Sequence, residues 1–334
     1  MRISFDWRLA RILDNEGNVL DELYWDGNSK PLSLAKRLHK IQEGRNPPEV
    51  KTLMERFPDA IVDPLGSISD SQWPPLNKEE ELLMHEATLE LAKLGIAASA
   101  GDKDRRLDML VSSANEALSS WNTLESRCVE WAGLFLSELK LDLHRGKIPQ
   151  FIAESTSISE VSDKFELAEP AHTPSDSEWS AIRSQAISAI QVFQTISEHE
   201  TAIRELANSY FPCLSALMGP LSASKLIVLA GTRERLARMP SGSLQVLGAS
   251  AAMAAHRRGA PPPKHGSILF SMPQISRSPR WLRGKISRFL AGKASIAVRI
   301  DHFGGTPWGK EEIDSINEEI EKIKLKFPNP PKRR

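Results

Sequence analysis

The chain has few of the residues that mark several common classes of protein. Only two of its 334 residues are cysteines, and Cys128 and Cys213 lie too far apart for a Cys-x-x-Cys zinc site. We expect both to be buried as small apolar residues. The sequence contains no run of about 18 apolar residues, so it predicts no membrane span.

The sequence also lacks the residue patterns that are typical of catalytic, metal-binding or nucleotide-binding sites. The eight histidines show no metal-ligand spacing, and no nucleophile lies in a pattern with a base. Residues 304–311 (GGTPWGKE) resemble a P-loop in outline, but Glu311 stands where a Ser or Thr must bind Mg²⁺. Residues 1–7 lack the apolar core of a signal peptide, which favours a cytoplasmic protein. The sequence therefore predicts no enzyme activity, no metal and no cofactor.

The net charge of zero conceals a strong asymmetry along the chain. Residues 219–305 carry 14 cations against two acids, a net charge of +12. Residues 1–218 carry 22 cations against 35 acids, a net charge of −13. Such a division is typical of proteins that bind nucleic acid or another anionic surface, and we expect RNA.

The order of hydrophobic patterns predicts a mainly α protein. Residues 1–75 read as a small α/β domain, with strands at 7–13, 19–25 and 60–62 and a helix at 31–41. The region 76–211 holds two long apolar repeats, 107–139 and 179–210, joined by a polar connector at 146–175. Their three- and four-residue spacing predicts a long antiparallel coiled coil that dimerises. An ordinary buried helix face is the alternative.

We expect the dimer seam to include Leu118, Trp121, Trp131 and Phe193. Glu200 interrupts the repeat between Ile196 and Ile203, which predicts a weak point. Beyond the coiled coil, a helical domain is expected at 212–327, with helices at 221–230, 243–256, 280–299 and 310–326. A basic tail, 328–334, follows.

Five ordered blocks in the basic region resemble the Nop domain, the RNA-binding module of box C/D ribonucleoprotein scaffolds. The blocks are PCLSALMGP (212–220), SLQVLGA (243–249), APPPKHG (260–266), RGKI (283–286) and AGKASIAVRID (291–301). The sequence EWAGL (130–134) is similar to the family's coiled-coil signature, and 327–334 resembles the tail of archaeal members. After Ala249 the family usually has Glu-Lys-Ala, whereas this chain has Ser250, Ala251 and Ala252.

The resemblance implies a non-catalytic scaffold of the archaeal box C/D ribonucleoprotein. Its N-terminal domain would dock fibrillarin, a methyltransferase for RNA-guided ribose 2′-O-methylation of ribosomal or transfer RNA. Its coiled coil would form a homodimer. Its Nop domain would clamp a box C/D guide RNA together with a kink-turn-binding protein of ribosomal type.

Several residues are candidates for contacts with RNA and with the kink-turn protein. Lys and Arg neutralise phosphates, and small residues allow a backbone to approach closely. The candidates are Gln245, Gly248, Ala249, Arg257, Lys264, His265, Arg283, Lys285, Arg288, Lys293 and Arg299. The last five cannot all face one way on a helix, and Arg299 could instead pair with Asp301. His265 either stacks on a base or serves as a structural loop residue.

Two other functions remain open at this point. One is a splicing-factor branch of the same family, which binds a kink-turn small nuclear RNA; the short tail and the α/β head argue against it. The other is a coiled-coil interaction protein whose basic module binds an acidic protein or a membrane surface. The charge pattern is also compatible with a solvated basic helix that binds no partner.

Overall fold

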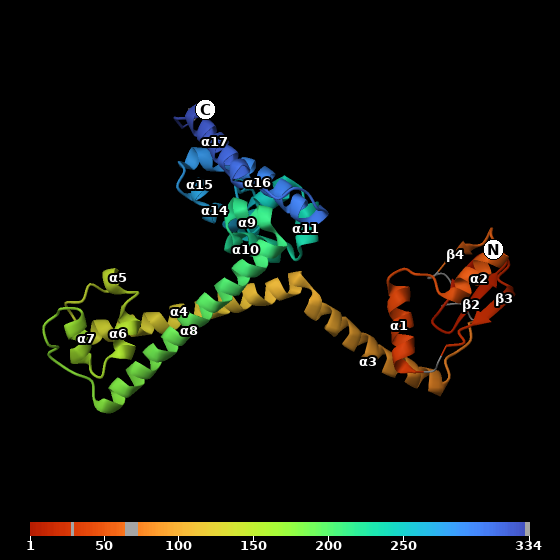
Figure 1. Ribbon diagram of the computed structural model, residues 1–334, viewed down its shortest axis with the longest axis horizontal. Coiled ribbons are helices and arrows are strands. Elements are labelled where there is room, and N and C mark those ends of the chain that lie inside the picture. The colour runs from red at the N-terminus through yellow and green to blue at the C-terminus, as the bar shows by residue number, and fades with distance from the viewer. Residues whose placement is uncertain (28–29, 64–72, 331–334) are drawn as a thin grey trace. The chain divides into compact units, whose positions relative to one another are not determined.

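The computed structural model describes residues 1–27, 30–63 and 73–330. The chain divides into two compact units, Met1–Asp102 and Lys103–Arg334 (Figure 1). The first unit extends beyond the boundary that we expected at residue 75, because helix α3 (Lys78–Gly101) packs against α1 (Pro31–Gln42). The predicted fold class, mainly α with a small N-terminal α/β part, is confirmed.

A four-stranded sheet forms the centre of the first unit. Its order is β3 (Val19–Tyr24), β2 (Leu9–Leu13), β1 (Arg2–Phe5) and β4 (Ile61–Val62). The pairs β3–β2 and β2–β1 are antiparallel, whereas β4 lies parallel to β1. Helix α2 (Pro48–Arg56) buries Val50 and Leu53 against Ile3 and Ile12 of the sheet. Strand β1 and helix α2 were not anticipated from the sequence.

Local signals explain two of these elements. In the predicted turn, the Asp14 carboxylate accepts the backbone amides of Glu16 and Asn18, both at 2.8 Å, and Gly17 takes φ +88°. Helix α3 begins with a capping box: Asn77 Oδ1 accepts the Glu80 amide, and the Glu80 carboxylate accepts the Asn77 amide. This reciprocal pair satisfies two donors at the helix start.

The second unit contains the two long helices, α4 (Lys103–Phe135) and α8 (Asp176–Tyr210), which lie side by side (Figure 1). Between them lie α5 (Leu141–His144), just before the predicted polar connector, and α6 (Ile148–Glu154) and α7 (Ile158–Lys164), which lie within it. Ile148, Ile152 and Val161 are fully buried against the ends of α4 and α8. The connector is therefore a folded tip that shares a core with the ends of α4 and α8.

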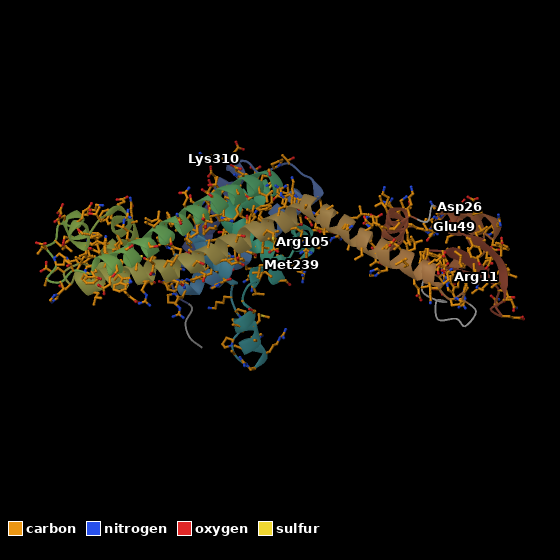
Figure 2. The ribbon with its side chains drawn as sticks, turned by 90° about the horizontal axis from the view of Figure 1, so that it is seen from below. Arg11, Asp26, Glu49, Arg105, Met239 and Lys310 are labelled. Carbon is orange, nitrogen blue, oxygen red and sulfur yellow. The ribbon has the colours of Figure 1, made fainter. Side chains whose placement is uncertain are left out.

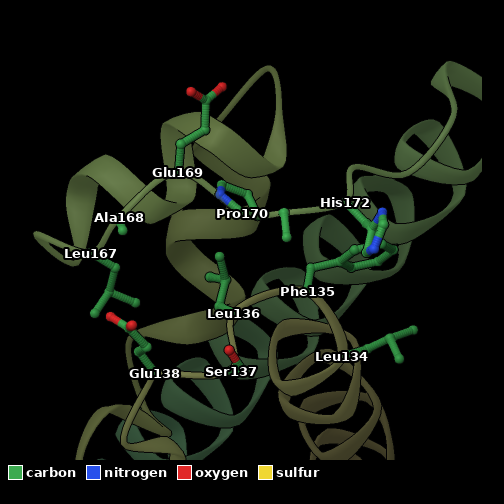
Figure 3. A pocket seen from close by; sticks show the side chains of 11 residues that line it. Leu134, Phe135, Leu136, Ser137, Glu138, Leu167, Ala168, Glu169, Pro170 and His172 are labelled. Atoms are coloured by element: carbon green, nitrogen blue, oxygen red, sulfur yellow. The ribbon is translucent and has the colours of Figure 1, made fainter.

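A cavity of about 310 Å³ lies at this tip, where the chain leaves α4 and where it continues after α7 (Figure 3). Leu134, Leu136, Leu167 and Pro170 contribute apolar lining. Of the described residues that line it, none is Lys or Arg, and Glu138 and Glu169 supply negative charge at its rim. This charge does not suit a nucleic-acid backbone.

The C-terminal part of the second unit is a layered helical module. Its helices are α9 (Pro212–Met218), α10 (Pro220–Ala230), α11 (Arg233–Arg238), α12 (Ser241–Gln245), α13 (Ser250–Arg257), α14 (Ser267–Ser271), α15 (Pro273–Ser276), α16 (Arg280–Phe303) and α17 (Lys310–Lys326). Leu226, Ile286 and Leu290 lie at its centre. Both cysteines are buried as expected, each 1% exposed.

In the part of the chain that the structure describes, no single helix is both long and apolar enough to cross a membrane. Only α9 and α10 taken together, bent by 116°, meet the length and composition. Of the tail predicted at 328–334, residues 331–334 lie outside the described residues.

Candidate nucleic-acid interface

Helix α16 divides into a buried and an exposed face. Its buried face includes Leu282, Ile286 and Leu290, which pack into the core of the module. At 100° per residue, positions 285, 288, 292 and 299 lie within about 60° of one another on the opposite side. Lys285, Arg288 and Arg299 are exposed there. We call these three residues and Gly292 the basic stripe.

The middle of the basic stripe is open. A Cβ atom on Gly292 would meet nothing within 4 Å, so the helix backbone is accessible between the cations. Arg288 makes no hydrogen bond or ion pair with any other described residue, whereas the Lys285 ammonium lies 3.7 Å from the Phe327 ring centre. Of the cations in the basic stripe, Arg288 is therefore the one that is most available for a phosphate.

The other two predicted cations of α16 lie outside the basic stripe. Arg283 donates from Nε to the Ser278 carbonyl at 2.9 Å and from Nη2 to the Ser276 carbonyl at 3.0 Å, at the end of α15. Lys293 is half-buried, with its ammonium 5.6 Å from the Phe289 ring. Helical geometry thus separates the five candidates, as the 100° rotation required.

Arg299 does not pair with Asp301, which was the alternative left open by the sequence. Arg299 Nε donates to the Ala237 carbonyl at 3.0 Å, at the end of α11. The Asp301 carboxylate instead accepts the backbone amides of Cys213 at 2.9 Å and Leu214 at 3.0 Å. Asp301, a residue of α16, thus satisfies two amides in the first turn of α9 that have no carbonyl partner within that helix.

The loop that contains Lys264 is fixed to the turn after α12. Gln245 Nε2 donates to the Lys264 carbonyl at 2.6 Å, and the Gly266 amide donates to the Gln245 carbonyl at 2.7 Å. A Cβ on Gly266 would lie 1.8 Å from the Leu247 carbonyl oxygen, so only glycine fits. Gln245, a predicted RNA-contact residue, is itself buried, and its side chain binds the Lys264 loop.

Lys264 lies against α16, and His265 lies against α14. A Cβ on Gly284 would lie 3.4 Å from Lys264 Cδ, so the absence of a side chain there leaves room for the lysine stem. The His265 ring stacks on the Phe270 ring, with ring centres 4.7 Å apart and an interplanar angle of 12°. The Arg283 guanidinium lies 5.3 Å from the centre of the Phe270 ring. Lys264 remains exposed. The loop and the first half of α16 therefore present one continuous basic surface.

Helix α13 projects from this surface. We expected one helix over 243–256, but the chain breaks at Gly248, which takes φ +82°, and resumes as α13. A Cβ on Gly248 would lie 2.7 Å from Ser267 Oγ. Helix α13 has no buried residue, and Figure 2 shows this teal segment projecting from the body of the unit. Ala249 precedes it, and Arg257 ends it with an exposed side chain.

Some cations that contribute to the charge of +12 have structural partners. Arg233 Nη1 donates to the Tyr210 carbonyl at 2.5 Å, and its guanidinium lies 3.9 Å from the Tyr210 ring. Arg238 pairs with Glu234 at 2.9 Å. The charge count therefore overstates the number of groups that are available to a ligand.

The predicted dimer seam is partly occupied within the chain. Trp121 packs on Phe193 with ring centres 5.0 Å apart, and Trp131 stacks on Phe135 at 6.3 Å. Phe193 nevertheless remains 56% exposed and Leu118 43% exposed. Glu200 lies at the seam with an ion pair to Arg204 at 3.1 Å, so its charge has a partner on its own helix.

Comparison with known proteins identifies the family. The family model described as "Nop: snoRNA binding domain, fibrillarin" matches residues 138–323, more than half of the chain. An uncharacterised NOP5 family protein of Methanocaldococcus jannaschii is 32% identical over 265 residues, which cover 74% of this chain and 64% of that protein. Nucleolar protein 56 of Homo sapiens is 31% identical over 228 residues, or 60% of this chain and 38% of that protein.

The match therefore spans less than two thirds of the length of either relative. A chain in the crystal structure of a fibrillarin/Nop5p complex has 23% sequence identity and a TM-score of 0.42, covering 92% of this chain and 97% of that chain. The family model spans residues 138–323 and therefore includes the blocks that build the basic stripe and the Lys264 loop. The chain belongs to the Nop family.

Proposed function

We propose that the chain is a non-catalytic scaffold of a box C/D ribonucleoprotein of the archaeal type. It binds guide RNA together with a kink-turn-binding protein and recruits a fibrillarin-type methyltransferase for ribose 2′-O-methylation of ribosomal or transfer RNA. It acts in the cytoplasm. The observation that carries the proposal is the basic surface of Lys264, Lys285 and Arg288 within a domain whose family description names snoRNA binding.

The RNA end of the scaffold is the C-terminal module. Arg288 supplies a free guanidinium, Lys264 an exposed ammonium, and Gly292 an accessible backbone. Helix α13 extends this surface with Arg257 and with a run of small residues in place of the family's Glu-Lys pair. Small residues suit close approach by a partner, so α13 is the part that meets RNA and the kink-turn protein together.

The methyltransferase end is the N-terminal unit. The family description names fibrillarin, and Met1–Asp102 forms a compact unit with its own sheet and cores. A separate unit suits this role because it can hold an enzyme without disturbing the RNA-binding module. Residues 1–75, with α3 as their support, are the proposed docking domain.

The coiled coil of α4 and α8 joins two copies of the scaffold. Leu118 and Phe193 are large apolar side chains that remain exposed on neighbouring helices. A second copy would cover them. A homodimer then presents two RNA-binding modules, which suits an RNA with two protein sites.

The proposal is tested by measuring the affinity of the full chain for a box C/D guide RNA, with and without the kink-turn protein. We expect the kink-turn protein to strengthen binding, and we expect a random RNA stem to bind more weakly under both conditions. Equal affinity for both RNAs, unchanged by the kink-turn protein, would refute the scaffold function. Retention of a fibrillarin-type methyltransferase by the full chain, but not by a chain that lacks residues 1–102, tests the other end.

A further inference from the structure

The N-terminal unit contains a cavity whose charge is opposite to that of the unit. Residues 1–102 carry 12 cations against 18 acids, a net charge of −6. Between α1 and the first turn of α2 lies a cavity of about 590 Å³; of the described residues that line it, five are cations and none is an acid. The cations are Lys36, Arg37, Lys40, Arg45 and Lys51. We call this cavity the α1–α2 basic pocket.

Three of the five cations have no internal partner. Lys36 and Lys40 are four residues apart on α1 and therefore share a face, and Lys51 lies on the first turn of α2. All three are exposed, and none of them pairs with a carboxylate elsewhere in the described chain. Arg37 and Arg45, by contrast, pair with Glu49 at 2.9 Å and Glu43 at 3.2 Å. Three positive charges thus face the cavity unneutralised.

The backbone adds to this positive potential. Helix α2 begins at the rim of the pocket, with Asn46, Pro47 and Pro48 among the lining residues. Among the described residues, no side chain caps its N-terminus. The positive end of a helix dipole favours an anion at that position. Glu49 in the same turn (Figure 2) is buried against Arg37 and does not line the cavity.

An aromatic ring forms one wall of the pocket. Trp25 is held by the Arg37 guanidinium, 5.2 Å from its ring centre, and by Trp7, whose ring centre is 6.3 Å away at 76°. The Gly27 backbone lies so close that a Cβ would come within 2.1 Å of the indole. Asp26, between the two, is not part of the lining. Sites for single-stranded nucleic acids combine an aromatic ring, on which a base stacks, with cations that contact the phosphates. The pocket has both, in Trp25 and the three unpaired lysines.

We propose that the α1–α2 basic pocket binds a single-stranded segment of RNA, with its phosphates on Lys36, Lys40 and Lys51 and a base beside Trp25. This inference rests on the proposed function, which makes RNA the ligand of the chain. It adds a second RNA contact on the unit that is proposed to dock the methyltransferase. The pocket would hold an unpaired strand, whereas the basic stripe of α16 holds the guide RNA.

The test uses the full chain and a short uridine oligonucleotide that carries 4-thiouridine. One variant combines Lys36→Ala, Lys40→Ala and Lys51→Ala; the matched control combines Lys30→Ala, Lys78→Ala and Lys93→Ala. The control residues are exposed lysines of the same unit outside the pocket, so both variants lose the same charge. Affinity is measured over a range of salt concentrations, and photocrosslinks are mapped by mass spectrometry.

Each phosphate contact to a single strand contributes about 0.7 to the slope of log affinity against log salt. Loss of three contacts should lower the slope by about two. When salt rises from roughly 50 to 200 mM, the affinity of the triple variant should therefore fall about twentyfold less than that of the wild type. The control should keep the wild-type slope, and crosslinks should fall between Trp25 and Lys51. Equal slopes for the two variants would overturn the inference.

Two further outcomes are separable. If polyglutamate of matched charge abolishes the crosslinks at Trp25 as effectively as unlabelled RNA does, the pocket recognises an acidic polypeptide and the inference is wrong. If the wild-type chain binds no RNA of any kind, the proposed function itself fails.

Discussion

The Gly266 amide donates a hydrogen bond to the Gln245 carbonyl at 2.7 Å, which brings the backbone of Gly266 against Leu247. This contact holds the Lys264 loop on the turn that leads to α13. Since a Cβ at Gly266 would lie 1.8 Å from the Leu247 oxygen, any other residue must separate the two segments. The position of the Lys264 loop therefore depends on the absence of a Cβ atom at residue 266.

Gly266→Ala should destabilise the chain by at least ~2 kcal/mol, because a backbone contact must open. Urea denaturation measures the change. Gly292→Ala is the matched control: its Cβ enters open space in a helix, and it should stabilise the chain by up to ~1 kcal/mol. A Gly266→Ala variant as stable as the wild type would contradict the close approach.

Two arginines on α16 should respond in opposite ways. Arg283→Gln removes donors to the Ser278 and Ser276 carbonyls and should lower stability by ~1–3 kcal/mol. Arg288→Gln removes an unpaired charge, so it should leave stability unchanged and reduce the salt slope of RNA binding by about 0.7–0.9. Denaturation and salt titrations on both variants check this division. The same effect from both variants would show that the two side chains do not have separate roles.

Asp301→Asn should weaken the junction of α9 and α16. The carboxylate accepts the Cys213 and Leu214 amides, and an amide group retains only part of this interaction. We expect a loss of ~1–2 kcal/mol, in the range of other helix N-terminal caps. Asp314→Asn, at an exposed position on α17, should change thermal stability little. Thermal unfolding of the two variants should therefore separate clearly.

The two buried thiols should be unreactive in the native protein. Burial raises the pKa of Cys128 to about 11, with help from the Glu125 charge, and burial raises the pKa of Cys213 to about 11 from an ordinary value of 9.0. The native state thus holds these protons more firmly than the unfolded chain does. This contribution to stability is complete below about pH 9 and is lost as the pH rises through about 11.

Alkylation at pH 8 should consequently be slow in buffer and fast in denaturant. Denaturation midpoints measured from pH 8 to pH 11 should fall across the upper half of that range. Fast native labelling of either cysteine at pH 8 would contradict its burial.

Leu118→Glu should dissociate the proposed dimer without unfolding the monomer. Leu118 is 43% exposed in a single chain, so a charge there is solvated in the monomer but would be buried at the seam. Sedimentation measures the mass, and circular dichroism measures the helix content. Leu143→Glu, at a side chain 74% exposed on α5, serves as the control. A monomeric wild-type chain would remove the basis for the seam.

Long elements were predictable because their signals are repeated many times. The helices α4, α8 and α16 follow from apolar spacing that tertiary contacts reinforce, so their predicted limits agree with the structure to within a few residues. The folded tip was missed because its apolar residues, such as Ile148 and Val161, are sparse among polar ones. The break at Gly248 was missed because a glycine within a helical pattern does not reveal whether its φ is positive.

The charge pattern predicted where exposed cations lie, but not the contacts that each candidate residue makes. The charge pattern pointed to α16 and the Lys264 loop, where the structure has exposed lysines and arginines. It could not distinguish Arg288, which is free of partners, from Arg283, which bonds two carbonyls seven and five residues away in sequence. It also gave no sign that Gln245 would be buried. Such distinctions depend on tertiary contacts between segments, which charge and spacing do not encode.

Helix α13 is only eight residues long and buries none of them. An isolated helix of this length is marginal in water, so its amides should exchange with solvent far faster than those of α16. The entropy of ordering the segment then falls on the binding step rather than on folding. The affinity of any partner that orders α13 is reduced by that amount, and a partner that orders α13 first makes the next one bind more tightly.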